Sequence, residues 1–133
     1  MTTEAITLVK DAIHNPAEPR HFMRFKPVTR QIRVLRGDTV LAESTHAMRL
    51  NEVGRDIYDS VVYLPRQDCS AALRPLADKS THCPLKGDAS YFTLDGNQPV
   101  AWTYDRPLAT TDFLRDYIAF YGDQVTVIET AIN

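Results

Sequence analysis

The densest group of reactive side chains in the sequence lies between Thr81 and Tyr91. These eleven residues include a thiol, an imidazole, an amine, carboxylate and hydroxyl groups. Polar groups at the junction of a loop and a strand can face a cleft, so we expect a functional site here. Lys86 is its leading candidate because, next to Gly87 and near Asp88, it can present a fixed positive charge to a carboxylate or phosphate. The alternative is an ordinary solvated lysine.

Cys83 is a candidate nucleophile within the same segment. A thiolate is the reactive form of cysteine, and a positive neighbour such as His82 or Lys86 would stabilise it. Consecutive residues of an extended chain point to opposite faces, however, so His82 cannot easily pair with Cys83. Free cysteine is also among the most buried residue types. We therefore favour a packing role for Cys83, and the same role for Cys69.

Two carboxylates at element boundaries complete the set of catalytic candidates. Asp68 follows Pro65 and most simply complements the start of a helical turn, with a role as base second. Glu52 has no such structural explanation and is a candidate hydrogen-bond acceptor or base.

Aromatic residues on predicted strands are candidates for the walls of a pocket. Tyr63, Tyr91 and Trp102 fall on such strands, and Tyr91 and Trp102 are expected near one another across a hairpin. Core packing is the commoner role for this arrangement, and a wall for a flat ligand is the alternative. We place the site where residues 63–68 meet residues 83–91 and Trp102. Arg66, in the first of these segments, is also assigned to ligand binding.

Alternation and spacing of apolar residues predict the elements that position these groups. Helices are expected where apolar residues recur every three or four positions, and hairpins where Gly-Asp or Asp-Gly separates two strand-like runs. In chain order we expect a helix over 3–15, an extended segment over 21–25, a hairpin around 37–38, a strand over 61–64, helical turns over 65–73, a hairpin around 95–97 and a helix over 112–121. The sum is a mainly antiparallel β or α+β protein, with an N-terminal helix and linker over 1–20 and a single β-rich domain over 21–133.

Composition excludes several classes of protein. The chain has 133 residues, 44% of them hydrophobic, which fits one globular domain. Its net charge of −2 provides no positive field for nucleic acid. Two cysteines are too few for a disulfide framework or a four-thiolate zinc site. Because no apolar run is long enough for a signal peptide or a membrane span, we expect a cytoplasmic protein.

Several residue blocks resemble one family. The pattern Cys83-Pro84, Lys86-Gly87, Ala89 and Tyr91-Phe92 has the residue types and spacing of that family's signature. Further blocks in order are Glu52 with Gly54, Tyr63-Leu64-Pro65-Arg66 with Asp68, Ala101-Trp102 with Tyr104 and Pro107, and Tyr117-Ile118-Ala119-Phe120-Tyr121. On these blocks the chain, from about His21 to Val125, resembles a bacterial and fungal family called domain of unknown function number 427, which also carries a nucleotidyltransferase-like label.

The resemblance implies a β-tent-like fold, similar to that of a zinc-binding exchange-factor family. The metal thiolates of that second family are absent here, so we expect no zinc site and no cofactor. Nucleotidyltransferases usually need paired acidic residues to hold Mg²⁺ against a triphosphate, and no closely spaced pair lies on a predicted strand. Lys86-Gly87 also lacks the flanking residues and the helix of a phosphate-binding P-loop. Whether the protein is an enzyme stays open.

Two hypotheses of different classes follow. The first is a pocket for a small anionic or nucleotide-like ligand, with Lys86 binding the anion, Glu52 or Asp68 accepting hydrogen bonds, and aromatic rings forming the walls. The second is a module without chemistry that meets a protein partner, or a second copy of itself, through a sheet face or edge. A third, thiol-dependent activity of Cys83 would require rapid alkylation at neutral pH.

Overall fold

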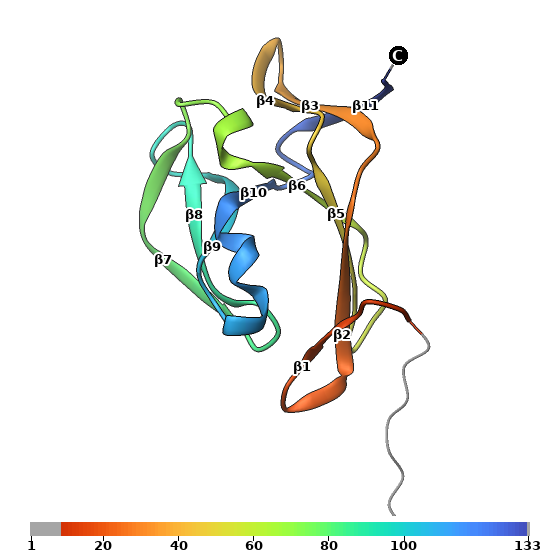
Figure 1. Ribbon diagram of the computed structural model, residues 1–133. Helices are drawn as coiled ribbons and strands as arrows, with labels where there is room; N and C mark the ends of the chain where they lie inside the picture. The colour runs from red at the N-terminus through yellow and green to blue at the C-terminus, as the bar shows by residue number, and fades with distance from the viewer. Residues whose placement is uncertain (1–8, 133) are drawn as a thin grey trace, which may run out of the picture.

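The computed structural model describes residues 9–132 and shows a mainly β protein (Figure 1). Its strands are β1 (Ile13–Asn15), β2 (Glu18–Pro27), β3 (Arg30–Arg36), β4 (Thr39–Ser44), β5 (Met48–Val53), β6 (Val61–Pro65), β7 (Arg74–Cys83), β8 (Gly87–Thr93), β9 (Pro99–Pro107), β10 (Tyr117–Phe120) and β11 (Thr126–Ala131). Helical structure in this part of the chain consists of two 3₁₀ segments, η1 (Arg66–Asp68) and η2 (Ala109–Asp116). Between residues 9 and 132 no helix has the length and apolar character needed to cross a membrane.

The strands form two antiparallel sheets. An eight-stranded sheet has the order β1-β2-β5-β6-β10-β9-β8-β7, and a three-stranded sheet has the order β11-β3-β4. Figure 1 shows the large sheet bent, so that β7, β8 and β9 lie across from β2 and β5, with β6 and β10 between them. The predicted mainly antiparallel β class is therefore confirmed.

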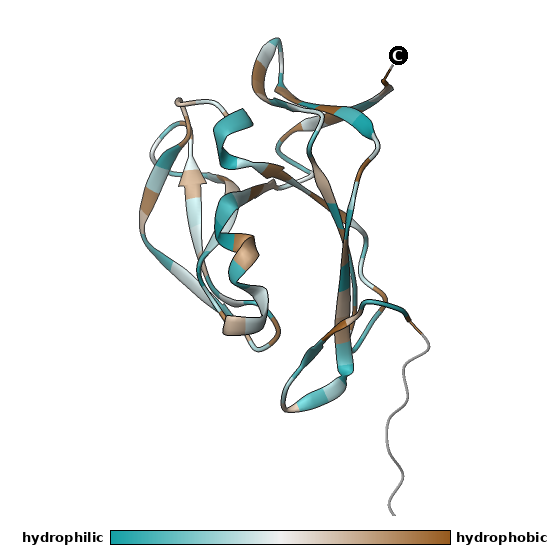
Figure 2. Ribbon diagram, viewed as in Figure 1, coloured by the Kyte–Doolittle hydropathy of each residue, from teal (hydrophilic) through white to brown (hydrophobic). Residues whose placement is uncertain are grey.

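Two clusters of buried apolar side chains hold the sheets in place. The first lies where the small sheet packs on β6, β9 and β10, and includes Ile32 and Leu64. The second lies between the two halves of the large sheet and includes Met23 and Leu85, both fully buried. Successive residues of a strand point to opposite faces, so β6 gives Leu64 to the first cluster and Tyr63 to the second. Part of β6 is brown, or hydrophobic, in Figure 2.

Local turn signals predicted the hairpins correctly. Gly37, at a φ of 59°, lies in the turn between β3 and β4, a left-handed conformation that glycine adopts without steric cost. Asp95 closes the turn between β8 and β9 by accepting hydrogen bonds from the backbone N–H groups of Asn97 and Gln98. The resulting register sets Tyr91 directly opposite Trp102, as expected.

The predicted N-terminal helix is not confirmed. Residues 3–8 lie outside the described part of the chain, and residues 13–15 form β1, which pairs with β2 through Ile13↔Met23 and His14↔Phe22. Asp11 has a φ of 61°, which a helix does not accommodate. The three- and four-residue apolar spacing was therefore a misleading signal, because pairing with β2 overrides it.

The predicted C-terminal helix is wrong over its second half. Helical structure ends at Asp116, and the next four residues form β10 between β6 and β9. Ile118 pairs with Leu64 on one side, and Ala119 pairs with Trp102 on the other. Tyrosine, isoleucine and phenylalanine favour strands, and these two long-range pairings outweigh the local helical periodicity. Of the helical turns predicted over 65–73, only η1 forms.

Candidate functional site

The turn between β7 and β8 positions Lys86. Cys83, at the end of β7, accepts a hydrogen bond from the Lys86 backbone N–H at 3.2 Å, and Pro84 supplies the fixed φ that such a four-residue turn favours. The Lys86 carbonyl accepts the Leu108 N–H at 3.0 Å and the Thr111 hydroxyl at 2.9 Å. These bonds fix the Lys86 backbone against the start of η2.

Gly87 makes this close approach feasible. Its φ is 112°, and a Cβ at this position would lie 2.5 Å from the Arg106 carbonyl oxygen and 2.6 Å from the Pro107 Cα. Only glycine fits such a site without a shift of the backbone. Lys86 and Gly87 therefore have complementary roles. Gly87 lets the turn pack closely against β9, and this places the Lys86 side chain in the interior.

Lys86 forms a buried ion pair with Glu52 of β5. Its Nζ donates to Glu52 Oε1 at 2.6 Å, and Lys86 is only 9% exposed. Burial alone would lower the pKa of Lys86, but the hydroxyls of Tyr63 and Tyr104 and the Glu52 carboxylate raise it above its ordinary value. Burial alone would raise the pKa of Glu52, but Lys86 and His21 lower it below its ordinary value. Both partners are therefore charged at neutral pH, and the solvated alternative for Lys86 is wrong.

His21 of β2 occupies the second oxygen of Glu52. Its Nε2 lies 2.8 Å from Glu52 Oε2, and its Nδ1 lies 3.2 Å from Asn15 Nδ2. The Ala17 N–H donates to Asn15 Oδ1 at 2.9 Å, which turns the amide NH₂ of Asn15 towards the imidazole. Nδ1 therefore accepts, and Nε2–H donates to Glu52. Gly54 leaves room for this ring, since a Cβ there would lie 3.2 Å from His21 Cδ2.

Aromatic rings surround the ion pair. Lys86 Nζ lies 5.4 Å from the centroid of the Tyr104 ring, and the Trp102 indole N–H donates to the Tyr63 hydroxyl at 3.3 Å. A cleft of about 160 Å³ opens above the pair. Its lining includes the sequence-predicted residues Glu52, Tyr63, Lys86, Tyr91 and Trp102, together with Leu50, Tyr58, Asp59, Val61, Tyr104 and Tyr121. Burial raises the pKa of Tyr63 and that of Tyr104, so both hydroxyls keep their protons at neutral pH.

Arg66 and Asp68 lie outside this cleft. The Arg66 guanidinium donates to the Arg115 carbonyl at 2.8 Å and to the Thr103 hydroxyl at 3.1 Å. Asp68 accepts the Ser44 hydroxyl at 2.5 Å, and no side chain caps η1. Both residues tie η1 to neighbouring elements, which is a structural role.

Cys83 lies beside His21 and Glu52. The thiol sulfur, an imidazole nitrogen and a carboxylate oxygen of these three residues all lie within 4.8 Å of one another. His82, by contrast, is exposed, and its Nδ1 lies 2.7 Å from Asp88 Oδ1. The sequence argument that His82 cannot serve Cys83 therefore agrees with the geometry, but a histidine 62 residues earlier takes that place.

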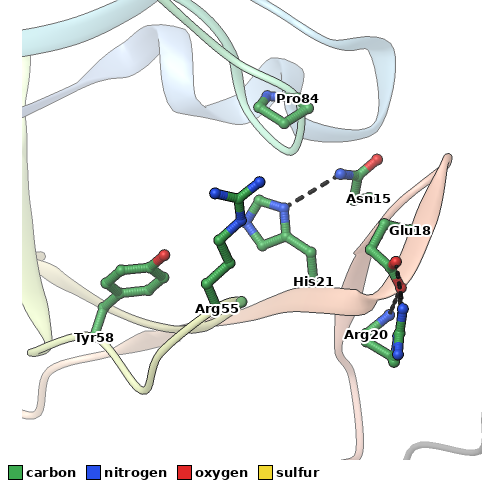
Figure 3. A pocket seen from close by; sticks show the side chains of 8 residues that line it. Asn15, Glu18, Arg20, His21, Arg55, Tyr58 and Pro84 are labelled. Carbon is green, nitrogen blue, oxygen red and sulfur yellow. Dashed lines mark hydrogen bonds and ion pairs between the residues drawn. The ribbon is translucent and has the colours of Figure 1, made fainter.

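A larger cleft of about 630 Å³ adjoins the first one (Figure 3). Tyr58 lines both, and His21 and Pro84 line the larger one. Figure 3 shows the Arg55 side chain extending alongside the His21 ring, with Pro84 on the far side of the cleft. His21 is thus reached from the larger cleft, while Lys86 and the aromatic rings line the smaller one.

Comparison with known proteins gives a family for the chain. The family model described as "Domain of unknown function (DUF427)" matches residues 24–131. The chain belongs to the DUF427 family. The nucleotidyltransferase label is a name carried by this family model and adds no assigned reaction. No curated protein matches the chain.

The DUF427 segment contains Glu52, Cys83 and Lys86, whereas Asn15 and His21 precede it. Sequence reasoning missed His21 as a site residue, because only the pairing of β2 with β5 brings it to Glu52. Tyr58 and Tyr121 were also missed as lining residues. Gly54, two residues after Glu52, was a signal that a bulky group packs beside this carboxylate. Tyr121 was missed because residues 112–121 were interpreted as a helix.

Proposed function

We propose that this DUF427 protein binds a small polar molecule, with an anionic or other acceptor oxygen, in the aromatic cleft above Lys86. The β-tent arrangement is part of the proposal, and the two antiparallel sheets, with the large one bent around the cleft, support it. The ligand's oxygen would meet Lys86, and the few atoms attached to it would lie among Tyr63, Trp102 and Tyr91.

The observation that carries the proposal is the incomplete hydrogen bonding of Lys86. An ammonium group has three donors. Within residues 9–132, Nζ has one hydrogen-bond acceptor, Glu52 Oε1, and the Tyr104 ring as a further contact. A buried ammonium with unused donors at the base of a cleft favours a ligand that brings an acceptor, because an unmade buried hydrogen bond costs about 1–3 kcal/mol.

Glu52 supports binding rather than proton abstraction. Both of its oxygens already accept a hydrogen bond, from Lys86 and from His21. Its pKa is lowered, burial notwithstanding, by these two neighbours, and a weakly basic carboxylate is a poor general base. Glu52 instead neutralises Lys86, so that the ammonium remains charged where water is scarce.

The size of the cleft limits the ligand. Pockets for drug-sized molecules have volumes of about 300–1,000 Å³. The volume of about 160 Å³ above Lys86 admits the charged end of a metabolite, such as a carboxylate or a phosphate with a few attached atoms. A nucleotide would have to extend past Tyr58 into the larger cleft.

The chain's single tryptophan lines this cleft and provides the assay. Small carboxylates, inorganic phosphate, sugar phosphates and nucleotides are titrated against the protein while Trp102 fluorescence and thermal unfolding are followed. A ligand at a hundred times its dissociation constant stabilises by about 2.7 kcal/mol, which raises the melting temperature by several degrees. Agreement between the two readouts identifies a ligand and its class.

Two variants separate binding from folding. Tyr104→Phe removes a hydroxyl from the cleft and keeps the ring, and Tyr117→Phe is its matched control, because Tyr117 does not line the cleft. We expect Tyr104→Phe to weaken binding about tenfold and the control to leave it unchanged. If no compound gives a shift, or if Tyr104→Phe and Lys86→Met both bind as the parent does, the ligand site is not here.

A second candidate function, protein interaction through a sheet edge, has one observation in its favour. β7 is an edge strand of the large sheet, and most of its residues are exposed. Its pairing with β8 is interrupted between Pro75 and Ser80, and Asp78 there has a φ of 62°. Such a bulge protects an edge against strand addition, which places this function second. Concentration-dependent sedimentation of the purified protein tests for self-association through it.

A further inference from the structure

We propose that His21, Glu52 and Cys83 form a transition-metal site, with Zn²⁺ as its best-suited ion. This inference goes beyond the ligand cleft and does not rest on it. The donors are one imidazole nitrogen, one carboxylate oxygen and one thiol sulfur, and the three atoms lie within 4.8 Å of one another. Zn²⁺ bonds of about 2.0–2.3 Å set tetrahedral ligand atoms roughly 3–4 Å apart, so the widest separation must contract by about 1 Å, while His21 Nε2 and Glu52 Oε2, now 2.8 Å apart, must move slightly apart.

The type of donor selects the metal. Thiolate favours soft or borderline ions, imidazole suits zinc, copper, iron and nickel, and carboxylate alone would suit magnesium and calcium. Zn²⁺ is the ion that accepts all three. Three protein ligands leave a fourth position open, as in catalytic rather than structural zinc sites. His21 lines the cleft of about 630 Å³, from which water or a further ligand reaches that position.

The strands bring these donors together from three distant parts of the chain. His21 lies on β2, Glu52 on the neighbouring β5, and Cys83 at the end of β7 in the opposite half of the sheet. Donors on paired strands are held more precisely than donors on loops. Lys86 holds the other oxygen of Glu52 at 2.6 Å, which orients the carboxylate as an outer-sphere partner does.

Metal uptake has a definite proton balance. The Cys83 thiol loses its proton to solvent as the sulfur–metal bond forms. Nε2 of His21 must lose its proton to bind the metal. The neutral ring then carries its proton on Nδ1, which faces Asn15. The Asn15 carboxamide then has to present its oxygen, which gives up the bond from the Ala17 N–H.

Cobalt is the probe for this site, because a bond between Co²⁺ and thiolate absorbs in the near ultraviolet. The chelator-treated, reduced protein is titrated with Co²⁺, and Zn²⁺ is then added to displace it. We expect one equivalent of Co²⁺ to give the thiolate band and Zn²⁺ to remove it. Cys83→Ser and His21→Gln should each lower affinity by at least about 100-fold, since even outer-sphere changes cost 10–100-fold.

The chain supplies matched controls. Its other cysteine, Cys69, and the exposed histidine His82 are changed in the same ways, and Cys69→Ser and His82→Gln should retain the band. Absence of a thiolate band in the parent, or its persistence in Cys83→Ser, overturns the proposal. Thermal unfolding of each apo variant shows that the fold is intact.

Two further measurements do not depend on removal of a ligand. In the unaltered protein, Zn²⁺ should slow the alkylation of Cys83 and leave the alkylation rate of Cys69 unchanged. Equal labelling of Cys83 with and without Zn²⁺ would contradict the site. Asn15→Asp provides an acceptor for Nδ1–H without rotation, so it should raise Zn²⁺ affinity about tenfold. Unchanged or weaker binding in Asn15→Asp excludes His21 as a ligand.

Discussion

The buried pair of Lys86 and Glu52 allows a quantitative test of this structure. The two side chains are 11% and 13% exposed, and their charged atoms lie 2.6 Å apart. At an effective dielectric constant of about 20, unit charges about 4 Å apart attract by about 4 kcal/mol. Removal of one partner leaves the other buried without a counterion, at a cost of about 3–5 kcal/mol. We expect Lys86→Met and Glu52→Gln each to destabilise by about 3 kcal/mol, since the pair is not fully enclosed.

The double variant distinguishes the pair from its surroundings. Replacement of a buried ion pair by neutral groups of similar size is often close to neutral in stability. In the double variant the new glutamine still offers an oxygen to His21, and the new methionine keeps apolar contact with Tyr104. Because neither new side chain reproduces the hydrogen bond of the pair, we expect a total loss of about 2–3 kcal/mol, which is more than neutral but well below the sum of the two single losses. The two single losses sum to about 6 kcal/mol, so the coupling energy is about 3 kcal/mol.

Equilibrium unfolding in urea measures all four corners of this cycle, and unchanged slopes show that the unfolded states are comparable. Arg115 and Asp112 form an exposed pair, with side chains 56% and 71% exposed, and serve as the control cycle. Exposed pairs couple by about 0.2–1 kcal/mol. A coupling energy between Lys86 and Glu52 no larger than that of the exposed pair would refute the reasoning, because it would mean that water screens the two charges.

Three further measurements test the packing of the protein. Gly87→Ala should destabilise the protein by about 3 kcal/mol in urea unfolding, because the new Cβ would lie 2.5 Å from the Arg106 carbonyl oxygen. Gly37→Ala is the control and should cost about 1 kcal/mol, since a Cβ there has nothing within 4 Å. Equal losses in the two variants would contradict the close approach at Gly87. Leu85→Ala empties a fully buried position and should cost about 3–5 kcal/mol, and a loss below about 1 kcal/mol would place Leu85 outside the core. Burial raises the pKa of Cys69 to about 12. Alkylation of Cys69 at pH 8, followed by mass spectrometry, should therefore be about 1,000-fold slower than for a thiol of ordinary pKa, and it should accelerate about tenfold per pH unit. Fast labelling would show that Cys69 is exposed.

Local signals in the sequence were sufficient for the β hairpins and for much of the cleft. The turn residues around Asp95 fix the pairing of β8 with β9, and so place Tyr91 opposite Trp102. Lys86 and Glu52 were singled out separately by residue type, and the structure joins them although 34 residues separate them. Their meeting was not predictable from spacing, because it depends on how the large sheet bends.

The incorrect predictions have separate physical causes. The C-terminal helix was predicted from apolar residues at helical spacing, but the same residues can form a central strand when a neighbouring strand pairs with each edge. β10 is such a strand, because it lies between β6 and β9. Asp68 was a candidate as a carboxylate at an element boundary, and Arg66 as part of the segment over residues 63–68, but the 3₁₀ turn that contains them lies outside the cleft. His21 was overlooked because its place beside Glu52 comes from the pairing of β2 with β5, which a single sequence does not reveal.

Glu52 connects the two proposals, since one of its oxygens accepts from Lys86 and the other from His21. A metal ion at the His21 side draws negative charge from the carboxylate and weakens its attraction for Lys86. The ammonium is then freer to bind an anion in the aromatic cleft, so Zn²⁺ should raise anion affinity. Binding free energies are coupled reciprocally, so the anion must raise Zn²⁺ affinity by the same factor. Trp102 titrations with and without Zn²⁺ measure that factor, and equal anion affinities would show that Glu52 transmits nothing between the sites.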